Sequence, residues 1–159
     1  MHPGWRPADL DADELEYALQ DGADFLEHVV TGGLIPPVET SARLGDDEWA
    51  YCDEELEFSR AADSPAAWSG ARVTRVVVTD QRLLVWVDGE WLTLPYDQVV
   101  EFRPDLADLS LFLELDGAPA VRLRGPQLPA RAVLLASFLY PAAELVALPG
   151  FAPLLGPGR

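Results

Sequence analysis

A tight β-hairpin in the middle of the chain constrains the fold more than any other feature. The stretch VVVTDQRLLVW, residues 76–86, places two apolar runs rich in β-branched residues on either side of the polar tetrad Thr79-Asp80-Gln81-Arg82. Such side chains pack well on a pleated surface, and an aspartate in the second turn position can hydrogen-bond to its own backbone. We therefore predict strands over residues 73–78 and 83–87, joined by a chain reversal at the tetrad.

The segment from residue 44 to residue 124 continues in short, alternating runs that are typical of a β-rich domain. Further strands are predicted over residues 49–58, 91–94, 99–102, 109–115 and 120–124, with turns at Asp88-Gly89 and Asp116-Gly117. Four leucines alternate with other residues over 109–115, which places them on one buried face. We expect the acids of residues 53–57 to point outward, together with Arg122 and Arg124, and Trp86 and Trp91 to lie in the core.

Helices are predicted on both sides of this segment. Asp9, Asp11 and Asp13 offer N-capping oxygens to a helix over the first thirty residues, and Gly32-Gly33 ends it. A second, apolar helix begins near Pro129, and Pro141 should kink it. A membrane span over residues 132–148 is the alternative for this helix, although it would be one of the shortest. The apolar tail, residues 150–159, could fold back on the domain or insert into a neighbour.

Several of these segments occur in a characteristic order. The order runs from LGDDEW at residues 44–49 through VTDQRLL at 78–84 and EWLTLPYDQVVEF at 90–102 to the apolar helix after Pro129. It resembles bacterial PH-like domains of the GRAM type over residues 43–148. The resemblance implies a mainly β (α+β) fold, a PH-like open β-barrel with a C-terminal capping helix, here with an additional N-terminal helix. It divides the chain into an acidic helix and linker (1–42), the PH-like domain (43–149) and the apolar tail (150–159), and it implies a non-enzymatic binding module.

Charge is distributed very unevenly along the chain. The net charge is −16, and residues 1–60 hold 16 of the 27 acidic residues but only 3 of the 11 basic ones, all of which are arginine. An excess of this sign repels phosphate backbones and anionic headgroups, which bind mainly through Lys and Arg. We therefore expect that the chain does not bind nucleic acid. A basic protein partner would instead be attracted to the N-terminal segment.

The candidate binding residues follow from this charge pattern. Asp13, Glu14, Glu16 and Asp24 would form an acidic docking surface on the first helix, and the alternative is a solvated face on a helix that only covers the barrel. Trp5 and Trp68, in loop or tail sequence, are candidate aromatic anchors for the partner. Arg82 is a candidate anion contact, and the alternative is that it satisfies loop carbonyls or a nearby carboxylate.

Catalytic and metal-binding patterns are missing from the sequence. It contains no Gly-rich phosphate loop, no G-x-S-x-G, no H-E-x-x-H and no Cys/His zinc spacing. Asp24 and His28 could reach one metal ion but have no third ligand, and Cys52 reads as a small residue in a strand. We thus expect no cofactor and no metal.

The function expected from these observations is that of a cytoplasmic protein-interaction module, an adaptor or regulatory subunit. The cytoplasmic location follows from the single cysteine and from the lack of a charged-then-apolar leader. Two alternatives stay open. One is a lipid-binding module at the inner face of the membrane, and the other is an acidic inhibitor or immunity-type protein for a basic partner.

Overall fold

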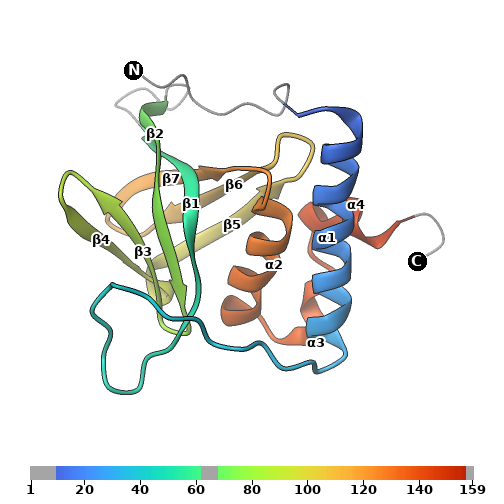
Figure 1. Ribbon diagram of the computed structural model, residues 1–159, viewed down its shortest axis with the longest axis horizontal. Coiled ribbons are helices and arrows are strands. Elements are labelled where there is room, and N and C mark those ends of the chain that lie inside the picture. The colour runs from blue at the N-terminus through green and yellow to red at the C-terminus, as the bar shows by residue number, and fades with distance from the viewer. Residues whose placement is uncertain (1–9, 62–67, 157–159) are drawn as a thin grey trace.

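Seven strands and several helices make up the computed structural model (Figure 1). It describes residues 10–61 and 68–156, and for residues 68–70 only the backbone. The elements are α1 (Ala12–Val30), β1 (Ala50–Ala61), β2 (Trp68–Thr79), β3 (Arg82–Val87), β4 (Glu90–Pro95), β5 (Val99–Asp105), β6 (Ser110–Leu115), β7 (Ala118–Arg124), α2 (Leu128–Leu139), α3 (Ala142–Leu145) and α4 (Ala152–Leu155). The expected α+β class, rich in strands and flanked by helices, is confirmed.

The strands form one antiparallel sheet in the order β4-β3-β2-β1-β7-β6-β5. Strand β1 joins its two halves, since it pairs with β2 along most of its length and with β7 only over Glu57, Phe58, Ser59 and Arg60. Within the described residues the edge strands β4 and β5 do not pair with each other, so the sheet is open.

The predicted hairpin is confirmed as β2 and β3, with Val76 opposite Val85 and Val78 opposite Leu83, all buried. Its turn is held by a different residue from the one expected. The Thr79 hydroxyl accepts hydrogen bonds from the backbone N–H groups of Gln81 (3.1 Å) and Arg82 (3.0 Å). The Asp80 carboxylate instead accepts from the backbone N–H of Trp49, at 3.1 Å, and so ties the turn to the start of β1.

Three expectations about which side chains face solvent are wrong. Glu57 is only 3% exposed because it lies opposite Arg124 in the β1–β7 register, and Arg124 is half-buried in the same contact. Arg122, which lies opposite Ser59, is half-buried as well. Glu54 is partly covered because it forms an ion pair with Arg131 of α2. Trp86 is 41% exposed, since its neighbours along the strand, Val85 and Val87, take the inward positions. The other inward residues are as predicted, namely Leu109, Leu111, Leu113, Leu115, Val121 and Leu123.

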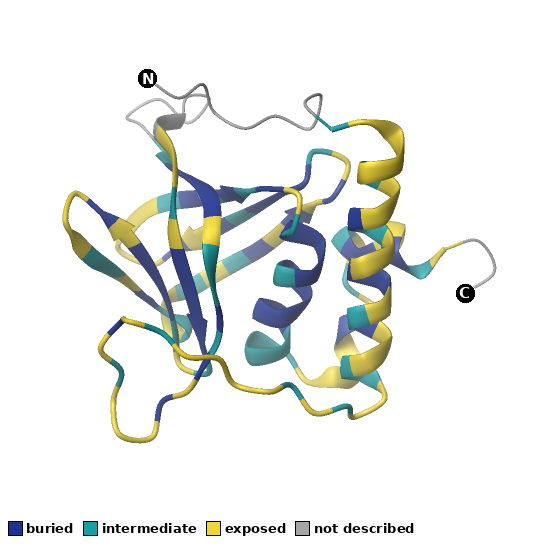
Figure 2. Cartoon of the chain, viewed as in Figure 1, coloured by how far each residue is buried: buried dark blue, intermediate teal, exposed yellow. Residues whose placement is uncertain are grey.

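Helix α2 lies between the sheet and α1, as Figure 1 shows. Eight of its twelve residues are buried, which fits a helix that is apolar all round. Helix α1 therefore packs mainly on α2, α3 and α4, and Figure 2 shows its outer side exposed. The Asp11 carboxylate caps α1 by accepting from the Glu14 N–H at 2.8 Å, as the sequence predicts.

The C-terminal segment folds back on the domain. Pro141 separates α2 from α3, so the chain breaks where only a kink was predicted. Beyond it, Phe151 and Leu154 are buried in the same hydrophobic core as Leu26 of α1 and Leu113 of β6, so one core crosses the predicted boundaries at residues 42 and 149. In the described part of the chain, no helix has both the length and the apolar character needed to cross a membrane.

The close contact between α1 and α2 generates a first prediction. A Cβ atom at Gly22 would lie 2.6 Å from the Cβ of Pro129, so the helices must move apart in Gly22→Ala. Overpacking of this kind costs about 1–3 kcal/mol, and the better helix propensity of alanine offsets about 1 kcal/mol. Because a 2.6 Å approach is a severe overlap, the cost should lie in the upper half of that range, and we expect a net loss of about 1–2 kcal/mol in the free energy of unfolding, measured with urea. Gly45→Ala is the matched control, because its new methyl meets nothing closer than 3.9 Å. Equal stability of the two variants would contradict this packing.

Candidate functional site

Six of the nine arginines in the described residues are paired with acids of the strands and their loops. The shortest described N···O distances are 2.9 Å for Arg72–Asp88, 2.7 Å for Arg75–Asp53, 2.8 Å for Arg82–Glu48, 3.2 Å for Arg103–Glu101 and 3.1 Å for Arg124–Asp108, and Arg131 pairs with Glu54. None of these partners belongs to α1. Within the described ranges, therefore, the carboxylates of α1 take part in no ion pair.

Helix α1 presents a row of exposed carboxylates on its outer side. Asp13, Glu14, Glu16 and Asp24 are all exposed, so one helix carries all four predicted docking acids. Asp24 accepts a hydrogen bond from Gln20 at 2.7 Å. The negative charge of Asp11 at the N-cap raises the pKa of Glu14 above its ordinary value through like-charge repulsion. A cation placed there would relieve this repulsion.

Tyr17 belongs to the same surface, although the sequence analysis did not identify it. Its side chain is 74% exposed, and Asp13 and Asp21 lie four residues before and after it. Tyr17 lines a pocket of about 460 Å³. Asp11 and Asp21 also line this pocket on the side of α1, and Pro126 and Gln127 line it on the side that leads into α2. The i, i+4 spacing of acid, tyrosine and acid is the signal that could have found it. An aromatic face beside carboxylates suits the side chain of an arginine or lysine.

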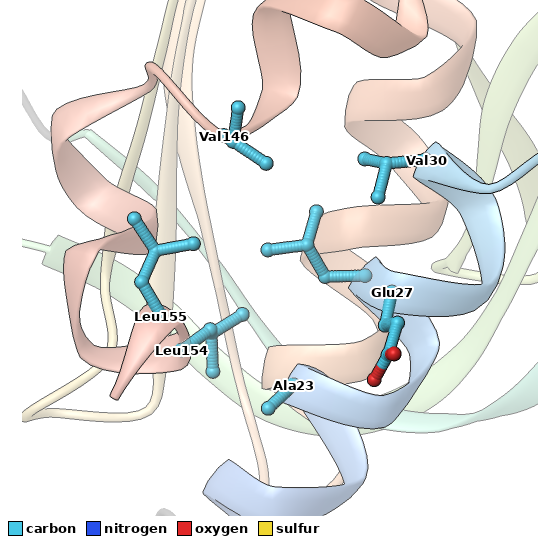
Figure 3. Close-up of a pocket in the computed structure, with 7 residues that line it drawn as sticks. Ala23, Glu27, Val30, Val146, Leu154 and Leu155 are labelled. Carbon is cyan, nitrogen blue, oxygen red and sulfur yellow. The ribbon is translucent and has the colours of Figure 1, made fainter. Parts of the chain in front are cut away.

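An apolar pocket of about 520 Å³ lies on the other flank of α1. Figure 3 shows aliphatic side chains of α1, among them Val30, facing Val146, Leu154 and Leu155 of the C-terminal segment, with Glu27 at the margin. These side chains offer contact area but no nucleophile or general base. The pocket can therefore receive an apolar side chain next to the acidic surface.

Arg82 lies in a buried polar cluster with Glu48 and Thr79. Its Nε and Nη2 atoms donate to the two carboxylate oxygens of Glu48 at 2.8 and 3.0 Å, and Nη2 also donates to the Arg43 carbonyl at 3.2 Å. These contacts match the alternative for Arg82, which is that its side chain satisfies loop carbonyls or a nearby carboxylate. A role of Arg82 as an anion contact stays a prediction.

The electrostatics of Glu48 follow from this cluster. Burial acts to raise its pKa, but hydrogen bonds from Arg82, Thr79 and the Gly45 N–H, together with the charge of Arg82, outweigh burial and hold the pKa below its ordinary value. Glu48 is thus ionised at neutral pH. It joins the loop before β1 to the turn of the hairpin.

The remaining reactive groups are held in structural contacts. Burial raises the pKa of Cys52 to about 12, so its thiol is protonated at neutral pH and is a poor nucleophile. The His28 Nε2 atom lies 2.7 Å from the Leu34 carbonyl oxygen and is engaged there. In the part of the chain that the structure describes, no three His, Cys, Asp or Glu side chains are grouped so that they could hold a metal ion.

Two predicted anchors cannot be placed. Trp5 lies outside the described residues, and Trp68 begins β2 with a side chain that is not described. The site assembled by the described residues is therefore the acidic face of α1, with Tyr17 within it and the apolar pocket beside it. No protein-family model matches the chain, and a comparison with curated proteins also finds no match.

The Glu48 cluster generates a second prediction. Glu48→Gln leaves Arg82, whose side chain is 27% exposed, without its charge partner, and we expect a loss of about 3 kcal/mol at pH 7. Because the pKa of Glu48 is lowered in the folded state, its stabilising effect is complete above the ordinary value of 4.5 and is lost as the pH falls through the lowered value. The difference between variant and parent, measured by urea unfolding, should therefore shrink in acid. Glu101→Gln, in the exposed pair with Arg103, should cost under about 1 kcal/mol. A deficit that does not depend on pH would contradict this account.

Proposed function

We propose that this protein is a non-enzymatic protein-interaction module, an adaptor or regulatory subunit that binds a basic protein partner through the acidic face of α1. One observation carries the proposal. Five strand arginines pair with acids of the sheet and its loops, whereas the exposed carboxylates of α1 form no ion pair among the described residues. This leaves a concentrated negative field on one helix, and such a field attracts and orients a basic partner.

The apolar pocket beside α1 supports the same proposal. Charge attraction mainly raises the association rate, and a buried apolar anchor is what slows dissociation. A partner segment with basic residues along one side and an aliphatic or aromatic side chain on the other would contact both features. The pocket has Glu27 at its margin, so basic residues next to the anchor would also be accommodated.

The proposal includes a PH-like fold for the chain and a cytoplasmic setting. The succession of seven antiparallel strands, with β1 joining β2 to β7 and α2 following the last strand, supports the fold assignment alongside the resemblance in sequence. Domains of this kind serve as platforms for many partners, so the fold by itself names none. The setting rests on the buried free thiol of Cys52, which suits a reducing compartment.

The proposal predicts that neutralising α1 weakens capture of basic proteins. The test variant changes Asp13, Glu14, Glu16 and Asp24 to Asn or Gln. The matched control changes Asp46, Glu90, Glu114 and Asp116, which are exposed elsewhere and alter the net charge equally. Each protein is used as bait, and the retained proteins are quantified by mass spectrometry. We expect a set of basic proteins that the parent and the control retain and the α1 variant loses, and we expect the association rate of a purified complex to fall steeply from roughly 50 to 500 mM salt.

Two results would count against the proposal. One is a retained set, and an association rate, that respond equally to the α1 variant and to the control. The other is co-sedimentation of the parent protein with neutral or anionic vesicles at physiological salt, which would favour the lipid-binding alternative. Circular dichroism of each variant checks that the fold is kept.

A further inference from the structure

The open sheet has two edges, and its β5 edge is protected against the addition of a further strand. Pro104 lacks a backbone N–H, and the pairing of β5 with β6 is irregular near its start. A charge stands at every second position of the strand, at Glu101, Arg103 and Asp105. The turn Pro149–Phe151 packs against the same strand. Prolines, irregular pairing, charges and covering loops are the features that keep natural edge strands from pairing with other chains.

Strand β4, at the other edge, lacks these features between its two ends. Its only charge is Glu90, at one end, and its only proline is Pro95, at the other. The four residues between them are uncharged, namely Trp91, Leu92, Thr93 and Leu94. The pairing with β3 is regular over all six residues, and no described strand pairs with the outer side of β4. This edge is therefore open to a further strand.

The backbone groups of Trp91 and Thr93 point away from β3. The turn before β4, Asp88-Gly89, has two positive φ angles, 52° and 83°, as a two-residue type I′ turn requires. The residues that flank such a turn form a hydrogen-bonded pair, and along an antiparallel ladder these pairs alternate with pairs that are not bonded. Trp86 lies opposite Trp91, and its carbonyl accordingly accepts from the Thr74 hydroxyl of β2, at 2.6 Å. Two N–H and two C=O groups of β4 are thus available at the edge.

A second copy of this chain matches the edge. When two β4 strands pair antiparallel about a two-fold axis at Leu92, Trp91 of each copy lies opposite Thr93 of the other, and their outward backbone groups bond to each other. The two Glu90 carboxylates then lie at opposite ends of the paired strands. We propose that the protein forms a dimer through this pairing of β4. The strand lies on the side of the molecule away from α1, so the dimer leaves the acidic face of α1 accessible (Figure 1).

Side chains beside the edge are complementary in the same arrangement. Trp86 is 41% exposed and contacts Trp91 edge to face, with 5.1 Å between the ring centroids. The Nη1 atom of Arg82 lies 3.5 Å from the Thr93 hydroxyl. Since Thr93 of one copy lies opposite Trp91 of the other, the Arg82 guanidinium meets the aromatic surface of the second copy. The dimer therefore adds side-chain contacts to the backbone bonds.

The charges around β4 oppose the dimer mainly at long range. The charges of the turn and of β3 are already paired, Asp88 with Arg72 and Arg82 with Glu48. Three carboxylates near the ends of the strand add negative charge, namely Asp80, Glu90 and Asp97. Together with the net charge of −16 on each copy, they repel a second copy. Salt screens this repulsion, so the dimer becomes stronger as the ionic strength rises, whereas attraction of a basic partner to α1 becomes weaker.

Analytical ultracentrifugation of the full-length protein over a wide range of concentrations tests the dimer. We expect a reversible monomer–dimer equilibrium whose dissociation constant falls as salt is raised from roughly 50 to 500 mM. Thr93→Pro removes an outward N–H from each copy and no bond to β3, and it should raise the dissociation constant about tenfold or more. Thr93→Val keeps the N–H and is the matched control, which should dimerise as the parent does. Circular dichroism checks the fold of each variant.

Amide exchange, measured by NMR on the ¹⁵N-labelled protein, shows whether β4 forms the contact. The amide protons of Trp91 and Thr93 should exchange rapidly in the monomer and become protected as the concentration rises. Leu92→Lys keeps the inference testable if Thr93→Pro does not fold, because the lysine stem can occupy the place of the half-buried leucine. It places two ammonium groups face to face at the axis and should also weaken the dimer about tenfold.

Four results would overturn the inference. The first is a protein that stays monomeric at every concentration and salt, and the second is a dimer that neither Thr93→Pro nor Leu92→Lys weakens. The third is a dimer that leaves the Trp91 and Thr93 amides unprotected, which would place its interface elsewhere. The fourth is a different protein that protects these amides in place of a second copy. The four-acid variant of α1 should dimerise at least as well as the parent, so loss of basic-protein capture in that variant tests the proposed function separately.

Discussion

Burial of α2 between the sheet and the other helices is the constraint on which the rest of the structure depends. The sheet is open, and its inner face needs a cover that is itself apolar. Leu134 and Leu135 of α2 are almost completely buried, so this helix contributes to the core both toward the sheet and toward α1. Apart from Arg131 and Ser137 the helix is apolar, so α1 and the C-terminal segment must lie against it to keep it from water. The N-terminal helix is thus part of the core even though its outer face is strongly acidic.

The distribution of ion pairs divides the molecule into two electrostatic parts. In the sheet, carboxylates and guanidinium groups lie opposite one another, as in the contacts of Arg75 with Asp53 and of Arg82 with Glu48. Such pairs leave little net field at a distance. On α1 the carboxylates are exposed and close enough to raise the pKa of Glu14. The field that a partner meets at this helix is therefore set by the helix's own carboxylates.

The sequence predicts the strands and the first helix well because their signals are local. Alternation in residues 109–115 and the capping aspartate before α1 each involve neighbours along the chain, and both are confirmed. The errors concern contacts between distant residues. Glu57 is buried because β7 brings Arg124 beside it, and Glu54 is covered by Arg131 from a helix 77 residues away. Neither pairing can be recognised from a local sequence pattern. For the same reason the four acids of α1 could be identified from sequence, while the burial of Glu57 could not.

The close packing of α1 on α2 has a consequence for the recognition of a partner. Gly22 allows the two helices to touch at Pro129, and the inner side of α1 is buried along Ala18, Ala23 and Leu26. Many acidic interaction segments are disordered and lose conformational entropy when they bind. Here the carboxylates sit on a helix that is already fixed, so a partner would find them at constant spacing and would bear little of that entropic cost. Carboxylates held at fixed spacing on a rigid helix select partners by the spacing of their basic residues, and not only by the number of those residues.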